Sequence, residues 1–416
     1  MLTADHMMID RRIIQEAETL ARHGYEVRLL AGFECKANTV HEKDGVRIER
    51  FVYEISEPSL KGALRQLFLF NRPFNALTHL WRKVRRRFTG VGAAVDRFEN
   101  FVLERAFLRE FDVVHVHDFP MLRIGAVAAA RAGVPLVYDA HELYPTQGDI
   151  TPKDRQIYEK RERKYIRRCD AVITVNPFIA DIMAKTYDIP TPHVILNAVN
   201  KVDVAPVDLK SRLGLAPDDR IVVFQGWLSE RRGLEKLVDA ARNFSPGVRL
   251  LLIGYGYHQP ALERMARDAG VEDRVIFYGE VPYEEMLPLL AGADLGIIPY
   301  YGIDPNARFC SPNKLFEFVM AGLPFIANDL PFLRTMVDRY GIGRLGDLTT
   351  AAGMAEMINA VLADEAGLER IKRCAAAARE ELNWDIEGEK LVQIYRPLGS
   401  PPEKTGSSAA PKALPR

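Results

Sequence analysis

The chain has 416 residues, 48% hydrophobic and 27% charged, which is long enough to bury the cores of two globular domains. Its 56 Lys and Arg balance its 56 Asp and Glu, and this zero formal charge argues against nucleic acid as a partner. The four cysteines form no Cys-x-x-Cys pair, which argues against zinc and a disulfide framework and favours a cytoplasmic protein. We find neither an apolar run long enough to span a bilayer nor a signal peptide.

The chain opens with a helix, a glycine and a strand. Apolar residues recur at helical spacing from Ile13 to His23, Gly24 ends this helix, and a strand is expected from Glu26 to Ala31. Such a unit is typical of the start of a Rossmann-like domain.

A basic and aromatic segment lies between Lys61 and Phe98. Leu67-Phe68-Leu69-Phe70 and Trp81 precede a cationic cluster made of Arg82, Lys83, Arg85, Arg86 and Arg87. On a helix, these residues predict a surface that rests on anionic lipid, to which each cation contributes roughly 1 kcal/mol. A solvated basic helix that packs through its aromatic side explains the pattern equally well.

Two buried strands with polar carboxyl ends come next. We expect them at 112–118 and 134–142, with a helix over 122–132 between them, which forms a βαβ unit. His117, Asp118, His141 and Glu142 lie at these ends. Taken singly, each histidine is as well explained by a place in the core.

The domain boundary is expected near residue 198. Before it we predict a charged helix over 155–168, a strand over 170–175, a helix capped by Asn176 and a strand over 194–196. The proline-bearing stretch that follows is typical of a linker.

The second half repeats the alternation. A strand over 220–225 leads through a loop into a helix that contains Leu237 and Ala240. A second strand ends in Gly254-Tyr255-Gly256, but Gln259 occupies the third glycine position of a dinucleotide fingerprint, which disfavours a dehydrogenase. A third strand and turn span 274–282.

The most informative stretch runs from the strand at 293–300 into a helix. Ser311-Pro312 predicts an N-cap followed by proline at the first helical position, and this helix start suits a phosphate. Lys314 adds a cation to the first turn, and Glu317 lies on the same face, where a carboxylate accepts hydrogen bonds from sugar hydroxyls. An ordinary capped helix with a Lys314–Glu317 ion pair explains the stretch equally well.

This stretch resembles the nucleotide-sugar site of glycosyltransferase family four, a retaining group with the GT-B fold. The family pattern is a Glu, seven residues, a second Glu, and a small-residue turn with Gly-x-Pro. Glu317 and Ala321-Gly322-Leu323-Pro324 match its second half, whereas Phe309 stands at the first Glu. The sequence is similar to a subgroup with Pro-Asn-Lys before the retained acid, and the resemblance covers about residues 10–397.

The resemblance implies an α/β protein with two Rossmann-like domains facing across a cleft. The expected domains are an N-terminal acceptor domain over 1–198 with a truncated first strand, its completing crossover helix over 383–398, a nucleotide-sugar domain over 199–382, and a disordered tail over 399–416.

The resemblance also implies site residues. Arg232 and Lys314 are expected to hold the diphosphate, Glu317 the ribose, and His141 the donor sugar; Trp227 stands where the family has an Arg. Further donor-binding residues are Gly226, Trp227, Gly254, Val281, Ser311, Asn313 and Leu315. His117, Asp118 and Glu142 are expected on the acceptor side.

The function implied is metal-independent, retaining transfer of a sugar from a nucleoside diphosphate to a hydroxyl of a glycan or lipid-linked acceptor at the inner face of the membrane. No cofactor is expected. Two alternatives stay open: a nucleotide-sugar epimerase of the same fold, and a catalytically silent partner subunit that binds the nucleotide sugar.

Overall fold

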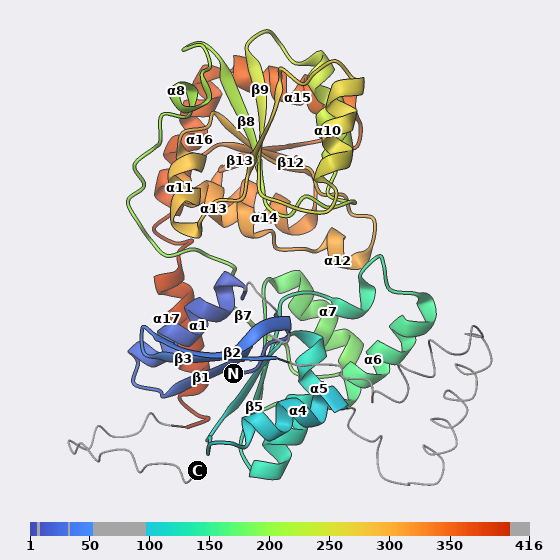
Figure 1. The fold of residues 1–416 in the computed structure, drawn as a ribbon, viewed down its shortest axis with the longest axis vertical. Coiled ribbons are helices and arrows are strands. Elements are labelled where there is room, and N and C mark those ends of the chain that lie inside the picture. Colours follow the sequence, from blue (N-terminus) through green and yellow to red (C-terminus); the bar gives the residue numbers. More distant parts are fainter. Residues whose placement is uncertain (6–8, 32–33, 53–96, 400–416) are drawn as a thin grey trace. The chain divides into compact units, whose positions relative to one another are not determined.

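The computed structural model describes residues 1–5, 9–31, 34–52 and 97–399 (Figure 1). Contacts divide the chain into two compact units, the first with residues 1–137, 168–170 and 398–416, the second with 138–167 and 171–397. The cationic cluster at 82–87 and residues 400–416 lie outside the described residues. Within them, no helix combines the length and the hydropathy needed to cross a membrane. The expected domain limits stay a prediction.

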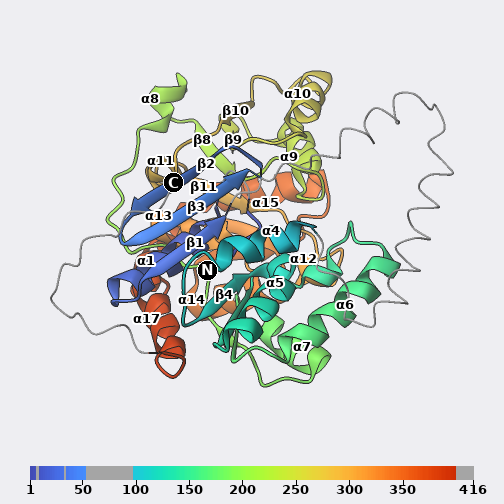
Figure 2. The ribbon, with the colours of Figure 1, turned by 60° about the horizontal axis from the view of Figure 1, so that its bottom comes forward.

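The first unit contains a three-stranded sheet of order β1-β3-β2 (Figure 2). Its elements are α1 (Arg11–Arg22), β1 (Val27–Ala31), β2 (Glu34–Lys43), β3 (Val46–Val52), α4 (Arg97–Ala106), β4 (Val114–His117) and α5 (Asp118–Ala132). The helix and strand expected near the N-terminus are confirmed as α1 and β1. Leu2 forms parallel bridges with Leu30 and Val116.

The antiparallel hairpin of β2 and β3 was not predicted. It turns at Asp44-Gly45, where φ is 51° and 79°. Positive φ at both central residues is what a tight hairpin turn requires, and Asp-Gly is a frequent sequence for it. That dipeptide is the signal that the sequence analysis overlooked.

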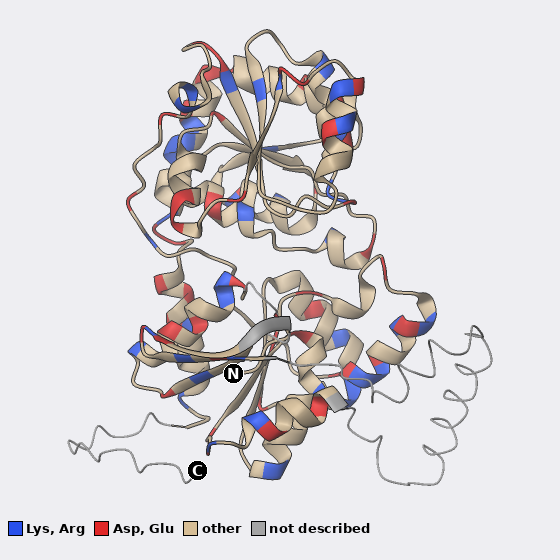
Figure 3. Ribbon diagram, in the orientation of Figure 1, with Lys and Arg blue, Asp and Glu red and all other residues tan. Residues whose placement is uncertain are grey.

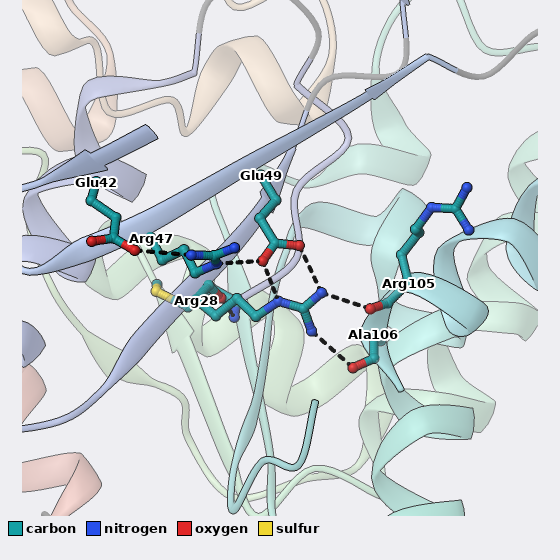
Figure 4. A network of polar contacts seen from close by, with 7 residues as sticks. Arg28, Glu42, Arg47, Glu49, Arg105 and Ala106 are labelled. Carbon is teal, nitrogen blue, oxygen red and sulfur yellow. Dashed lines mark hydrogen bonds and ion pairs between the residues drawn. The ribbon is translucent and has the colours of Figure 1, made fainter. Parts of the chain in front are cut away.

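An arginine network joins this sheet to α4 (Figure 4). Arg28 binds both carboxylate oxygens of Glu49, at 2.9 and 2.7 Å, and donates to the carbonyls of Arg105 and Ala106 at 2.7 and 3.0 Å. Arg47 contacts Glu49 from the other side at 2.8 Å. Because the last carbonyls of a helix have no helical partner, Arg28 completes the end of α4.

A four-stranded sheet has the order β4-β5-β6-β7. The elements after α5 are β5 (Leu136–Ala140), η1 (Tyr144–Thr146), α6 (Pro152–Ile166), β6 (Ala171–Thr174), α7 (Pro177–Tyr187) and β7 (His193–Val194). Asn176 caps α7 as predicted, since its side chain accepts from the amide of Ile179. The strand predicted over 194–196 ends at Val194 instead, because the Leu196 amide donates to Glu387 at 2.9 Å.

The second unit also holds a six-stranded sheet of order β10-β9-β8-β11-β12-β13, with parallel pairing throughout. Its strands are β8 (Arg220–Gln225), β9 (Val248–Ile253), β10 (Val275–Gly279), β11 (Leu295–Ile298), β12 (Phe325–Asn328) and β13 (Gly343–Gly346). The order reverses between β8 and β11, and α/β proteins bind ligands at such a switch point.

Helices cover both faces of this sheet (Figure 1). The helices that follow β7 in the chain are α8 (Leu209–Leu213), α9 (Leu234–Ala240), η2 (Ala241–Asn243), α10 (Gln259–Asp268), α11 (Tyr283–Ala291), α12 (Pro305–Arg308), α13 (Asn313–Ala321), α14 (Pro331–Tyr340), α15 (Ala351–Ala363), α16 (Glu365–Ala378) and α17 (Trp384–Tyr395). Ile221 and Val223 of β8 join one buried cluster, and Val222 and Phe224 join another. This alternation places one core on each face of the sheet.

Candidate functional site

The switch point is built by the loop after β8, the segment after β11 and the first turn of α13. The helix starts one residue later than predicted: Pro312, not Ser311, is its N-cap. The reason is the extended ψ of 128° at Pro312, which keeps that residue out of the helix. Ser311 is buried, and its carbonyl accepts from the Asn197 side chain at 3.0 Å.

Two cations converge there on one hydroxyl. Arg232 donates from Nη1 to the Tyr300 oxygen at 2.7 Å, and Lys314 Nζ donates to the same oxygen. Arg232 is also held by Ser229 at 3.1 Å, and Lys314 is 4% exposed. The two expected diphosphate ligands, separated by 82 positions in the chain, are therefore brought together.

Burial and neighbouring charges have opposing effects on the pKa values of Lys314 and Tyr300. Burial lowers the pKa of Lys314, and Arg232 lowers it further, whereas Tyr300 opposes the shift. Burial tends to raise the pKa of Tyr300, but the two cations bring it below its ordinary value. A single hydroxyl thus serves as the acceptor for two positive charges, and an anion would satisfy both better.

Glu317 lies beside these cations at the end of β8. It is 7% exposed and accepts from the Gln225 side chain. Lys314 donates to Tyr300, so the first-turn lysine is oriented towards the strand ends. The expected contact of Glu317 with the ribose stays a prediction.

Two glycines bring the loops after β8 and β9 together next to Lys314. Gly226 and Gly254 have φ of 126° and 134°. A Cβ on Gly254 would come 2.1 Å from the Gly226 carbonyl oxygen, and one on Gly226 would lie 3.8 Å from Lys314 Nζ. Only glycine fits at Gly254, because any Cβ there would collide with the Gly226 backbone.

Trp227 extends the site with aromatic surface. Its ring lies 4.8 Å from Tyr255 and 6.5 Å from Tyr257, and Trp227 is 41% exposed. Trp227 was predicted from the sequence, whereas the two tyrosines, which flank the second glycine of the Gly-x-Gly turn, were not. Tyr300 was not predicted either, although it follows β11 at the carboxyl end of the strand.

The other residues predicted to bind the donor, Val281, Asn313 and Leu315, differ in how deeply they are buried. Val281 follows β10 and Asn313 begins α13, and both are half-buried. Leu315 is fully buried in the core next to α13, so its side chain packs the domain, contrary to a side-chain contact with the donor. Any contribution of Leu315 to binding rests on its backbone.

His141 and Glu142 follow β5. His141 Nε2 lies 3.1 Å from Asp139, and a carboxylate at that distance fixes the orientation of the ring. Glu142 accepts from Gln147 and, at 3.0 Å, from Asn306 of α12, whose own oxygen accepts from the Leu143 amide at 3.0 Å. Asn306, absent from the sequence prediction, therefore joins α12 to the loop after β5.

Phe309, at the position of the missing acid, has a packing role. Its ring stacks on Phe178 at 6.1 Å, and its carbonyl accepts from Asn176 at 2.8 Å. An apolar side chain is consistent with that place.

His117 and Asp118 lie in the first unit. His117 is fully buried and stacks on His115 at 4.4 Å, and Asp118 begins α5 with φ of 60°. His115 lies 3.6 Å from Glu16, which pairs with Arg12 at 3.0 Å. The histidines thus adjoin a buried ionic network, and their acceptor role stays a prediction.

Two family models match the chain. Residues 9–198 match a glycosyl transferase 4-like domain, and residues 208–381 match glycosyl transferases group 1. The chain therefore belongs to the glycosyltransferases that these two models describe. The D-inositol 3-phosphate glycosyltransferase of Xylanimonas cellulosilytica is 27% identical to the present glycosyltransferase over 312 residues, which are 68% of this chain and 72% of that protein.

Solved structures share the GT-B fold of this glycosyltransferase. Sucrose-phosphate synthase from Thermosynechococcus elongatus superposes with a TM-score of 0.72 at 19% identity, covering 95% of this chain and 98% of that one. HepE of Anabaena, solved in complex with UDP-glucose, gives a TM-score of 0.70 at 18% identity over 95% and 99% of the two chains. The α/β fold expected from the sequence is confirmed.

Proposed function

We propose that this glycosyltransferase moves a sugar, with retention and without a metal, from a nucleoside diphosphate to an acceptor hydroxyl, in the synthesis of a cell-surface polysaccharide or lipid-linked glycan. The observation that carries the proposal is the convergence of Arg232 and Lys314 on Tyr300 at the switch point. The complex of HepE with UDP-glucose supports a nucleotide sugar as donor.

The two cations supply what the departing diphosphate needs. As the bond to the sugar breaks, negative charge grows on the diphosphate, and fixed positive groups in a buried site stabilise that charge more than they stabilise the bound donor. The guanidinium of Arg232 offers two parallel donors to phosphate oxygens, whereas Lys314 acts as a compact charge. Together they take the role that a divalent ion would otherwise fill.

Retention is proposed to follow attack of the acceptor on the same face that the diphosphate leaves, with the departing phosphate oxygen taking the hydroxyl proton. No protein nucleophile is required. Cys310, which follows α12, does not provide one, because burial raises the pKa of its thiol to about 12 and keeps it protonated. His141, oriented by Asp139, is proposed to position the donor sugar.

A screen of nucleotides tests this function. We expect one of UDP, GDP or ADP, or a sugar conjugate, to raise the melting temperature selectively and Glu317→Ala to reduce that shift, since ligands stabilise the folded state by RT ln(1 + [L]/Kd). Incubation with acceptor should then release the nucleoside diphosphate and form an anomer with the donor's configuration.

Three results would contradict the proposal in different ways. A donor sugar that changes configuration without an acceptor would indicate an epimerase. Nucleotide binding with no turnover on any acceptor would indicate a silent subunit. If no nucleotide changed the melting temperature of a folded sample, the assignment of a donor site would be contradicted.

A further inference from the structure

The helix α6 carries a line of cations along its exposed side. Lys153, Ile157, Lys160, Lys164 and Arg167 follow one another at steps of four, three, four and three residues, which aligns them on one face of a helix. All five are exposed, Ile157 by 45%. Figure 3 shows the concentration of Lys and Arg on this helix.

The acids of α6 lie away from this line. At about 100° per residue, Asp154 and Glu159 project to either side of the opposite, buried face, on which Glu162 lies. Asp154 accepts from Thr151 at the N-cap, and Glu159 pairs with Arg155 at 2.7 Å. The exposed line therefore contains no carboxylate.

The three lysines of the line keep their charge available. Arg167 pairs with Asp188 at 3.1 Å, whereas Lys153, Lys160 and Lys164 form no ion pair within the described chain. Lys164 lies 5.2 Å from the ring of Tyr165, a contact that leaves the ammonium charged. Three unpaired ammonium groups about an isoleucine are thus presented to the solvent.

We propose that this face of α6 docks on an anionic lipid surface. Lysines meet headgroup phosphates while their stems cover apolar surface, and an aliphatic side chain among them enters the boundary of the acyl chains. Charge complementarity would suit a soluble polyanion as well, but only a bilayer gives Ile157 a favourable place. The inference is independent of the proposed donor chemistry, because it uses none of the donor-site residues.

The position of α6 connects this surface with the expected acceptor side. Tyr158 of α6 packs on Tyr144 of η1 with ring centroids 6.0 Å apart, and Tyr144 lies two residues after Glu142. An α6 that rests on a bilayer would therefore hold the loop after β5 near the surface, where a lipid-linked acceptor is found.

Vesicle flotation of the full chain tests the proposal. We expect binding to vesicles that contain phosphatidylglycerol, none to pure phosphatidylcholine, and loss of binding at 1 M salt, where the screening length falls to about 3 Å. The variant K153Q/K160Q/K164Q should bind roughly 100-fold more weakly. The control R264Q/R267Q/R370Q removes the same charge from exposed positions of α10 and α16 and should bind as the wild type does.

A second variant separates lipid from other anions. Ile157→Asn should weaken vesicle binding and leave binding to heparin, a soluble polyanion, unchanged. Wild-type protein that binds heparin but not anionic vesicles would overturn the proposal, as would a triple variant that floats like the wild type, since binding would then arise elsewhere. Unchanged melting temperatures and nucleotide shifts show that the variants are folded.

Discussion

Two buried regions of the second unit join ionisable groups to tyrosine hydroxyls, with opposite results. Between β5, α6 and α7, Glu162 accepts from Tyr138 at 2.8 Å and from Tyr187 at 2.5 Å, so each carboxylate oxygen has its own donor. At the switch point, Arg232 and Lys314 share the single hydroxyl of Tyr300. In the first region each acceptor oxygen has its own donor, whereas in the second two cationic donors meet one hydroxyl.

That difference distinguishes a network that stabilises the fold from a cluster whose two cations are proposed to bind a diphosphate. Buried polar groups are normally satisfied by protein partners, and α/β proteins bind ligands at the carboxyl ends of strands where the strand order reverses.

Lys314→Met should abolish most activity without destabilising the fold. Loss of one fixed positive group facing a developing anion costs about 10²–10³-fold in kcat. Lys314 donates to a neutral hydroxyl, and a charge buried without an ion-pair partner costs free energy, so an apolar chain of similar size should leave the melting temperature the same or raise it. Turnover and thermal unfolding measure the two effects.

Lys236→Met is the matched control, because Lys236 is exposed and donates to the Thr349 carbonyl. It should keep wild-type turnover. If Lys314→Met unfolded at a much lower temperature than the wild type, the main role of Lys314 would be to stabilise the fold.

Glu162→Gln should change how stability depends on pH. Burial raises the pKa of Glu162 to about 7, although its hydrogen bonds from Tyr187 and Tyr138 oppose the shift. The folded state then holds a proton that the unfolded state releases above its ordinary pKa near 4.5, so stability falls as the pH rises between these values, by roughly 3 kcal/mol in all.

The free energy of unfolding in urea at several pH values measures this effect. Between pH 5 and pH 8, the free energy of unfolding of Glu162→Gln should increase relative to that of the wild type. A difference that does not vary with pH would show that Glu162 does not titrate there.

Tyr300→Phe should lower the stability of the ligand-free protein modestly and increase the stabilisation that a nucleoside diphosphate provides. It removes the acceptor shared by the buried Lys314 and the half-buried Arg232, which costs about 1–3 kcal/mol of stability. The same loss leaves the cations in greater need of an anion, so a saturating nucleoside diphosphate should restore more stability to this variant than to the wild type. Melting temperatures with and without ligand measure the difference, and equal shifts would contradict it.

The sequence predicted much of this unit because local signals agreed with the fold. The apolar run of β8, the Asn176 cap and the β11–α13 connection were all visible, and the family resemblance selected Arg232 and Lys314. The helix start was misplaced by one residue because a proline after a serine fits two capping geometries, and only the observed ψ distinguishes them.

The partners of the site residues were not predictable in the same way. Tyr300 meets Arg232 from 68 positions away, and Asn306 meets Glu142 from 164 positions away. Such pairs are set by strand order and by loop paths, which leave no periodic trace in the sequence. The aromatic group of Trp227, Tyr255 and Tyr257 likewise arises only when the loops after β8 and β9 adjoin.

A calorimetric titration of Arg232→Gln and the wild type with a nucleoside, its monophosphate and its diphosphate is the decisive test of the proposed diphosphate site. Wild-type affinity should rise with each phosphate, and Arg232→Gln should lose most of the gain due to the second one, because a charge-assisted contact contributes about 1.5–3 kcal/mol. Equal affinity of the two proteins for the diphosphate would contradict the claim that Arg232 and Lys314 form the diphosphate site.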